Sequence, residues 1–378
     1  MRHRPRVLIT LASWTRGISG GDQHILASAG RWAERADVSV VCARGARQMV
    51  ADAVPEAGIH AFPAAAPASS VGLAAAYLAR MVPAFAAARR AGPVDVAVAG
   101  SHFLPDAAAL LGARAGLRAV FVYHLSAGKG RPAGVHTALA LAGESGALAA
   151  LRRIADVGLT SNGETEATLR RRRWRVARTN VGIELGPSRS TGRREPEYAG
   201  AFLGRLMPTK GLDDFVRVVA AIRVRRPGDR FVVIGIGPAE ADARELADRL
   251  GVQDAIDWAG FVVEERKREL LARSRLLIFP SREEGWGIAV CEALAVGTPA
   301  VCYALPVLQE LFDPGIATAA VGDPRGLAER CLALLEDDVA REALGRRGRA
   351  HVERYDVGAV ARAELALLLP GSAPQGLG

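Results

Sequence analysis

Short apolar runs alternate with longer amphipathic stretches along nearly the whole chain. In the first half, the apolar runs predict strands at 6–11, 38–43, 94–100, 118–125, 156–162 and 176–183. In the second half, they predict strands at 198–204, 229–237, 255–262, 275–281, 299–305 and 317–321. Between them, Ala-rich stretches such as 22–35 and 105–115 place apolar residues at helical spacing. Alternating strands and helices are typical of parallel sheets with helices on both faces.

A polar segment rich in Gly, Pro and Arg interrupts this alternation near the middle of the chain. Its sequence, GPSRSTGRREPEYAG, covers residues 186–200 and is typical of a linker. The pattern therefore predicts two doubly wound, Rossmann-like domains at 1–185 and 199–355, joined by a hinge at 186–198. Residues 356–378 are expected to form a C-terminal helix and tail that cross back to the N-terminal domain. Ligands of such sheets bind at the carboxyl ends of the strands, so the expected site is a cleft between the domains.

The formal net charge of +9 raises the question of nucleic-acid binding. Only three of the 49 basic residues are lysines, so the abundant arginine indicates a GC-rich coding bias. The sharpest basic cluster, Arg170 to Arg175, is interpreted as a solvated helix end, with contact to an anionic membrane or an acceptor as the alternative. The sequence has no aromatic RNA-binding signature and no zinc-finger spacing, and no nucleic-acid partner is expected.

The sequence also bears on the compartment of the protein. No uncharged apolar run approaches the ~20 residues that a membrane-spanning helix needs. The first residues lack a small-residue cleavage site, so they are not interpreted as a signal peptide. Four scattered cysteines form no CxxC pair, which predicts a reduced, cytoplasmic protein without structural zinc. A peripheral contact with the inner face of the membrane is compatible with the positive charge.

The segment SREEGWGIAVCEALAVGTPAV (281–301) combines acids with a glycine-rich corner. It leaves the predicted strand 275–281 and enters a helix expected to run from about Gly287 to Val296. The first turn of a helix offers free N–H groups and the positive end of its dipole, which suit a phosphate. Glu284 and Glu292 can accept hydrogen bonds from the hydroxyls of a sugar or a ribose. Trp286 is expected to wall this pocket.

Four elements in this order resemble family 4 glycosyltransferases, which have the GT-B fold. EGWGIAVCE (284–292) is similar to the family's E-x7-E signature, and GRLMPTKG (204–211) to its Gly-Arg…Lys-Gly element. GGDQH (20–24) resembles the N-terminal glycine loop, and NVGIE (180–184) resembles the Asn-Gly-Val-Asp element before the hinge. The chain departs from the family where Val and Gly are exchanged in NVGIE, where Glu184 replaces Asp, and where Trp286 replaces the commoner Phe.

The resemblance, the chemistry of the residues and the G-x-G of VIGIGP (233–238) together give two sets of residues that are expected to bind a nucleotide-diphosphate sugar. The catalytic set is His124, Glu284, Arg205 and Lys210. Of these, His124 is implied near the reaction centre, while Arg205 and Lys210 carry charges that suit the diphosphate. The donor-binding set is Gly20, Gly21, Gly237, Phe261, Val262, Gly285, Trp286, Gly287, Ile288, Ala289 and Glu292.

Roles within the donor-binding set follow from the same resemblance. Gly20 and Gly21 are expected to form a closing loop, and Phe261 with Val262 to lie near the base. Glu292 is expected to hold the ribose. Glu284, with the amides of Trp286 and Gly287, is expected to hold the sugar. The N–H groups of Ile288 and Ala289 are expected to face the phosphates.

Several polar residues near the predicted strand ends have more than one interpretation. His102 either faces the cleft or is structural, whereas His24 is interpreted as structural. Lys129, in the loop SAGKGRP, either meets an acceptor or lies free. Asp213 and Asp214 are interpreted as acids in the first turn of a helix and not as a metal site.

These features predict a glycosyltransferase that moves a sugar from a UDP- or GDP-hexose type of donor to an acceptor hydroxyl. The resemblance implies retention of anomeric configuration. A clamp of cations and amides on the diphosphate needs no metal ion and no cofactor. Expected acceptors are a glycan, a lipid-linked sugar or a natural-product aglycone. The alternatives are a non-catalytic nucleotide-sugar binding protein and another GT-B enzyme, such as a sugar-nucleotide epimerase.

Overall fold

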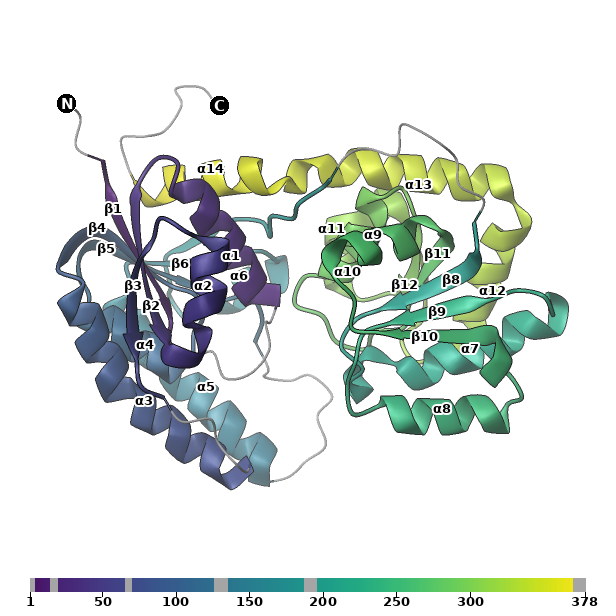
Figure 1. The fold of residues 1–378 in the computed structure, drawn as a ribbon, viewed down its shortest axis with the longest axis horizontal. Coiled ribbons are helices and arrows are strands. Elements are labelled where there is room, and N and C mark those ends of the chain that lie inside the picture. Colours follow the sequence, from purple (N-terminus) through teal and green to yellow (C-terminus); the bar gives the residue numbers. More distant parts are fainter. Residues whose placement is uncertain (1–3, 14–19, 65–69, 126–134, 187–195, 370–378) are drawn as a thin grey trace. The chain divides into compact units, whose positions relative to one another are not determined.

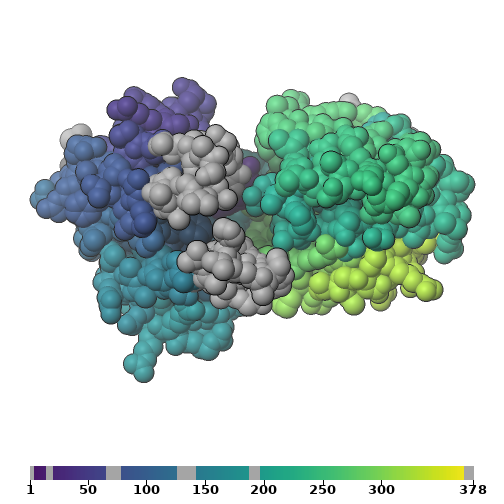
Figure 2. Space-filling view, turned by 90° about the horizontal axis from the view of Figure 1, so that it is seen from below, coloured from purple at the N-terminus to yellow at the C-terminus, as the bar shows by residue number. Residues whose placement is uncertain are grey.

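The computed structural model describes residues 4–13, 20–64, 70–125, 135–186 and 196–369. Of residues 70–77 and 135–141 it describes only the backbone. The chain divides into two compact units (Figure 1). Unit 1 comprises Met1–Gly182 and Tyr355–Gly378, and unit 2 comprises Ile183–Arg354. Figure 2 is a space-filling view in which the chain up to Gly182 runs from purple to teal and unit 2 runs from teal through green towards yellow.

Unit 1 is built on a parallel sheet. Among its described residues, seven strands pair in the order β3-β2-β1-β4-β5-β6-β7, with every pairing parallel. The strands are β1 (Arg6–Leu11), β2 (Asp37–Ala43), β3 (Gly58–Phe62), β4 (Pro93–Ala99), β5 (Arg114–Phe121), β6 (Val157–Thr160) and β7 (Val176–Arg178). The helices are α1 (Gly20–Trp32), α2 (Arg47–Ala53), α3 (Ser70–Arg90), α4 (Leu104–Gly112), α5 (Val135–Ile154), α6 (Gly163–Arg171) and α14 (Val357–Leu368).

Unit 2 repeats this architecture with fewer strands. Its described strands pair in the order β10-β9-β8-β11-β12-β13, again all parallel. They are β8 (Tyr198–Leu203), β9 (Phe231–Ile234), β10 (Ile256–Gly260), β11 (Ser274–Phe279), β12 (Ala300–Tyr303) and β13 (Ile316–Ala319). The helices are α7 (Leu212–Arg225), α8 (Glu240–Arg249), α9 (Glu264–Ala272), α10 (Ile288–Ala295), α11 (Pro306–Phe312), α12 (Pro324–Glu336) and α13 (Asp338–Val352).

The apolar runs form the cores because each sheet is covered on both faces. In unit 1, one core cluster joins the sheet to α1, α2 and α14, and a second joins it to α3, α4, α5 and α6. In unit 2, α7, α8 and α12 pack on one face, and Figure 1 shows α9, α10 and α13 on the other. A strand buried on both faces needs apolar residues throughout, as in β8, whose six residues are all buried. The predicted two-domain, doubly wound fold is confirmed.

The last helix of the chain belongs to unit 1 and packs on α1. Glu364 of α14 is completely buried and accepts three hydrogen bonds, from His24 (2.9 Å), Ser28 (2.8 Å) and Thr179 (2.9 Å). The N–H of Gly182 donates to His24 Nδ1 at 3.0 Å, so the Nε2–H of the ring donates to Glu364. His24 is therefore structural, as expected.

Three strand predictions need correction. The run 118–125 was expected to be one strand, but β5 occupies Arg114–Phe121, because pairing with β4 begins at Arg114. The run 176–183 forms only the short β7, since the chain then leaves the sheet. Strand β3 was missed because GIHAF mixes polar and apolar residues and is only partly buried. Part of the predicted hinge, 187–195, lies outside the described residues.

Candidate functional site

Two of the predicted catalytic side chains meet in unit 2. Lys210 Nζ lies 2.6 Å from Glu284 Oε1 and also donates to the carbonyl of Glu283 at 3.2 Å. Lys210 follows β8, and Glu284 follows the neighbouring strand β11, so parallel pairing brings their loops to the same edge of the sheet. Both side chains are mostly buried, with 18% and 9% exposed. The ion pair therefore occupies the place where such sheets bind ligands.

The turn that carries Lys210 is held from both sides. Pro208–Lys210 form one turn of 3-10 helix, and Gly211 follows with φ +69°. A Cβ on Gly211 would stand 2.1 Å from the carbonyl oxygen of Pro280, so only glycine fits there. The N–H of Arg282 donates to the carbonyl of Thr209 at 2.9 Å. The chain after β11 thus fixes the position of Lys210.

Arg282 is a site-forming residue that the sequence reasoning missed. Its guanidinium lies 2.9 Å from Asp213 and 2.6 Å from Asp214, the first-turn acids of α7, and it also contacts the carbonyl of Pro208 at 3.2 Å. Burial lowers the pKa of Arg282, but the two carboxylates outweigh burial and leave that pKa above its ordinary value. Asp213 and Asp214 lie in the first turn of α7, as predicted.

The glycine corner opens helix α10 as predicted. Gly287 precedes the helix with φ +103°, and a Cβ there would lie 2.5 Å from Leu308. Its carbonyl accepts from Val290 and Cys291, at 3.0 and 3.1 Å. The amides of Ile288 and Ala289 stand in the first turn, where helix geometry supplies no partner for them. Gly297, with φ +81°, ends the helix.

Trp286 is buried against an apolar neighbour, and its place in the wall of a ligand pocket stays a prediction. Its indole is 4% exposed and packs edge-on against Phe312, with ring centroids 5.1 Å apart. Apolar packing under α10 accounts for a large aromatic ring at this position. Gly285, beside it, is partly exposed.

The second motif glutamate forms an ion pair that was not anticipated. Glu292 Oε1 lies 2.7 Å from Nζ of Lys267, which also lies 2.7 Å from Glu264. Lys267 is on α9, and α9 packs against α10. Burial raises the pKa of Glu292, and Lys267 lowers it in part. The sequence feature that could have drawn attention to Lys267 is its residue type, because it is one of only three lysines in an arginine-rich chain.

The remaining unit 2 predictions lie in loops after β8, β9 and β10. Arg205 is exposed just after β8. Gly237 has a packing role, because a Cβ would stand 2.5 Å from the carbonyl oxygen of Leu206. Phe261 is 79% exposed and Val262 is partly exposed after β10, and Ile236 is 57% exposed after β9. Exposed apolar side chains at these strand ends are available to a flat ligand.

The predicted site residues of unit 1 lie in α1, after β5 and in a loop outside the described residues. Gly20 and Gly21 lie in the first turn of α1 and not in a loop, and a Cβ on Gly21 would meet the ring of Tyr123 at 2.8 Å. Gly21 therefore permits close packing of the helix. His124 is partly buried beyond the end of β5. Lys129 lies outside the described residues.

Two other features of unit 1 have structural roles. His102 is buried, and its Nε2 lies 3.1 Å from Oε1 of Glu144 on α5, a hydrogen-bond partner that the sequence did not suggest. The cluster Arg170 to Arg175 ends α6 with exposed arginines, and Arg170 pairs with Glu166 at 2.8 Å. The exposed arginines agree with a solvated helix end, and contact with an anionic membrane or an acceptor stays the alternative prediction.

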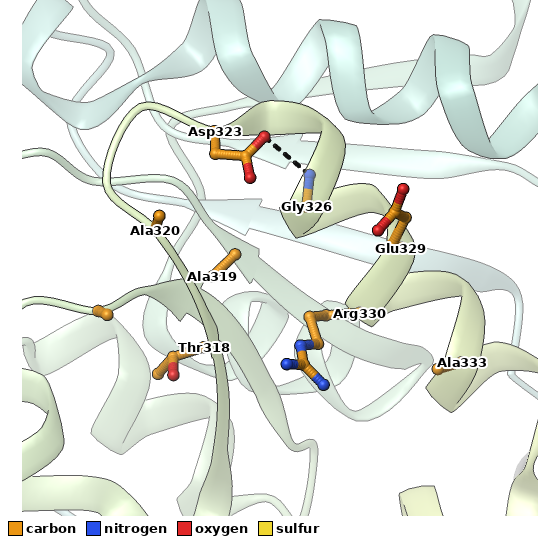
Figure 3. A pocket seen from close by; sticks show the side chains of 9 residues that line it. Thr318, Ala319, Ala320, Asp323, Gly326, Glu329, Arg330 and Ala333 are labelled. Carbon is orange, nitrogen blue, oxygen red and sulfur yellow. Dashed lines mark hydrogen bonds between the residues drawn. The ribbon is translucent and has the colours of Figure 1, made fainter.

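A separate pocket of about 550 Å³ lies between the edge strand β13 and helix α12 (Figure 3). Alanines form much of its wall, and Asp323 is occupied in capping α12 through the N–H of Gly326 at 2.9 Å. None of the predicted site residues lines it. The strand-end site around Lys210 and Glu284 therefore remains the functional candidate.

The described residues offer neither a metal-binding cluster nor a membrane-spanning helix. No three His, Cys, Asp or Glu side chains among them are grouped so as to hold a metal ion. Within the described ranges, no helix is both long and apolar enough to cross a membrane. All four cysteines are free and buried.

Two Rossmann-like units in one chain are the architecture of the GT-B fold. A solved structure with this architecture, Anabaena Alr3699/HepE in complex with UDP and glucose, superposes with a TM-score of 0.76. The superposition covers 96% of this chain and 99% of that one at 16% sequence identity, so it shows the fold. Residues 188–351, less than half of the chain, match the family model described as Glycosyl transferases group 1. That segment contains Lys210, Glu284 and Glu292.

Two sequence relatives of this chain are glycosyltransferases by name. A Corynebacterium glutamicum GDP-mannose-dependent monoacylated alpha-(1-6)-phosphatidylinositol monomannoside mannosyltransferase is 30% identical over 157 residues, which are 39% of this chain and 41% of that protein. A D-inositol 3-phosphate glycosyltransferase of Segniliparus rotundus is 30% identical over 198 residues, 50% of this chain and 42% of that protein. The chain thus spans about two-fifths of the length of these relatives.

Proposed function

We propose that this chain is a glycosyltransferase that transfers a hexose from a nucleotide-diphosphate sugar to an acceptor hydroxyl. The observation that carries the proposal is the Lys210–Glu284 ion pair at 2.6 Å, next to the amino end of α10. The group 1 match covers these residues, and relatives with that similarity are glycosyltransferases by name. A cation, two amides and a carboxylate at one strand end suit a diphosphate joined to a sugar.

The chemical difficulty in this reaction is the departing diphosphate. The bond from the anomeric carbon to a phosphate oxygen breaks as the bond to the acceptor oxygen forms, so negative charge gathers on the diphosphate. Lys210, Arg205 and the amides of Ile288 and Ala289 would stabilise that charge from fixed positions. Glu284, once Lys210 turns to phosphate, would accept hydrogen bonds from sugar hydroxyls, and Glu292 would accept from the ribose. This set supports transfer without a metal ion; retention of configuration and a role for His124 rest on the family resemblance.

The acceptor is proposed to be a glycan, a lipid-linked sugar or an aglycone bound by unit 1. An apolar stripe on α3 favours an apolar or lipid-linked acceptor. Leu78, Val82 and Phe85 are 58%, 77% and 37% exposed, and their spacing of four and three places them on one helix face. Arg89 and Arg90 end the same helix, so contact with an anionic membrane surface is compatible with it. The name of one relative includes a monoacylated phosphatidylinositol monomannoside.

Variants at Lys210 test the proposed chemistry. We expect Lys210→Ala to lower donor-dependent nucleotide release by roughly 10²–10³, because one preorganised donor to the leaving group is lost. Arg266→Ala, which removes a charge from an exposed pair on α9, is the matched control and should keep wild-type rates. Unfolding midpoints of both variants check that the fold is intact. Wild-type turnover in Lys210→Ala would remove Lys210 from the mechanism.

A further inference from the structure

Lys267 lies between two carboxylates of different exposure. Its Nζ is 2.7 Å from Glu264 Oε1 and 2.7 Å from Glu292 Oε1. The Glu264 side chain is 62% exposed, whereas that of Glu292 is 21% exposed and that of Lys267 only 12%. Exposed pairs contribute little to stability, so the inner contact, between Lys267 and Glu292, is the consequential one.

The residue type at position 267 is informative. The chain contains 49 basic residues and three lysines, leaving 46 arginines, yet lysines pair with both motif glutamates, Lys210 with Glu284 and Lys267 with Glu292. An ammonium engages a carboxylate as a point charge, here at Oε1, while an arginine fork engages both oxygens. A lysine partner therefore leaves Glu292 more capacity to accept hydrogen bonds from a ligand.

The charges around Glu292 set the pKa of its carboxyl group, and Lys267 is the main group that lowers this pKa. Burial raises the pKa of Glu292, Lys267 lowers it, Glu264 raises it further and Arg268 lowers it. The pKa of Lys267 stands above its ordinary value, because its two carboxylates outweigh burial, so the amine stays charged at neutral pH. Without this amine, Glu292 would be protonated to a higher pH.

Other elements packed against α10 bring few charges near Glu292. Arg349 of α13 donates to the carbonyl of Ala295 at the far end of α10. Arg275 of β11 lies 3.9 Å from Asp338. Cys291, next to Glu292, has a raised pKa because it is buried. Lys267 is therefore the charged group that meets Glu292 directly.

We propose that Lys267 is a positioning residue for nucleotide binding: it holds the Glu292 carboxylate ionised and oriented to accept hydrogen bonds from the ribose hydroxyls. The proposal rests on the proposed role of Glu292 in the glycosyltransferase. It makes Lys267 a determinant of the preference for ribonucleoside over 2′-deoxyribonucleoside diphosphates. Lys267 acts through Glu292 and does not itself need to touch the donor.

The test is calorimetric titration of the full chain with UDP, GDP and their 2′-deoxy forms. Lys267→Met should weaken ribonucleotide binding by about 10–100-fold, the loss typical when a residue that orients a ligand-binding group is removed. Binding of the 2′-deoxy form should change less, so the ratio of the two affinities should fall. Arg266→Met is the matched control, because it removes one positive charge from the same helix without touching Glu292, and its ratio should stay at the wild-type value.

The pH dependence gives a second readout. Loss of the amine moves the pKa of Glu292 further up, and a protonated carboxyl accepts poorly, so affinity in Lys267→Met should rise as pH increases from 5 to 8. The wild type should change less over that range. A residue that only pins α9 to α10 would lower the unfolding midpoint and leave both the affinity ratio and the pH profile unchanged.

Further variants distinguish a wrong role for Lys267 from a wrong donor site. Lys267→Arg keeps the charge and the fold, but its fork should occupy both oxygens and lower the affinity ratio; an unchanged ratio in both Lys267 variants would overturn the inference. Glu292→Gln should lower the ratio, and adding Lys267→Met should then change it little. If Glu292→Gln also keeps the wild-type ratio, or neither nucleotide binds, the donor site is wrong and the inference falls with it.

Discussion

At the scale of single residues, glycine and lysine shape the site around α10. Gly211 and Gly287 adopt positive φ angles where backbone or side chains leave no room for a Cβ. Lys210 reaches Glu284 from a turn fixed by Arg282. The sequence predicted the glycines and Lys210 because they stand directly after predicted strands. It did not predict that Lys267 pairs with Glu292, 25 residues away, or that Arg282 pairs with Asp213 and Asp214, 69 and 68 residues away.

Gly287, which adopts a positive φ angle at the start of α10, provides a stability test. Gly287→Ala should lower the free energy of unfolding by about 1–3 kcal/mol, because alanine is disfavoured at φ +103° and its Cβ meets Leu308. Nucleotide affinity should fall with it, since the first turn of α10 must shift. Gly228→Ala is the control, because a Cβ there meets nothing within 4 Å. Chemical denaturation measures the free energy of unfolding of both variants. Equal stability of the two variants would contradict the role of Gly287.

At the scale of elements, α14 is tied to α1 by a buried polar cluster. Truncating Glu364 to alanine would leave three donors, on His24, Ser28 and Thr179, without their acceptor. We expect a loss of about 2–4 kcal/mol in the stability of unit 1. Glu34→Ala, whose exposed pair with Arg31 is 3.5 Å long, should change stability by no more than about 0.5 kcal/mol. Hydrogen exchange in α14 measures this loss of stability. If Glu364→Ala left the exchange rates in α14 unchanged, the account would be contradicted.

The apolar stripe of α3 is a second test at this scale. Val82→Asp should reduce co-sedimentation with anionic lipid vesicles several-fold, because it places a negative charge in the exposed apolar face. Val224→Asp on α7 is the matched control, since Val224 is 84% exposed but lies in unit 2. Equal binding of the two variants and the wild type would show that α3 does not contact the vesicle.

At the scale of the whole molecule, strand and helix periodicity predicted the architecture well. In unit 2, each predicted strand overlaps an observed one, because buried parallel strands read as continuous apolar runs. In unit 1, β3 was missed and β5 displaced, because partly buried edges and loops blur the apolar pattern. The burial of Trp286 also escaped the sequence analysis, since this loop residue packs against Phe312 of α11, which lies beyond the next helix and strand of the chain.

The most direct test of the proposed function is nucleotide release from a panel of UDP-, GDP- and TDP-sugars, with and without a chelator. The account predicts slow release from one donor, at the same rate when divalent ions are removed, and thermal stabilisation by the matching nucleotide diphosphate. Release that stops in chelator would contradict metal independence. Stabilisation with no release, in the presence of glycan, lipid-linked and aglycone acceptors, would favour a nucleotide-sugar binding protein. Neither release nor stabilisation with any member of the panel would contradict the donor site at Lys210 and Glu284.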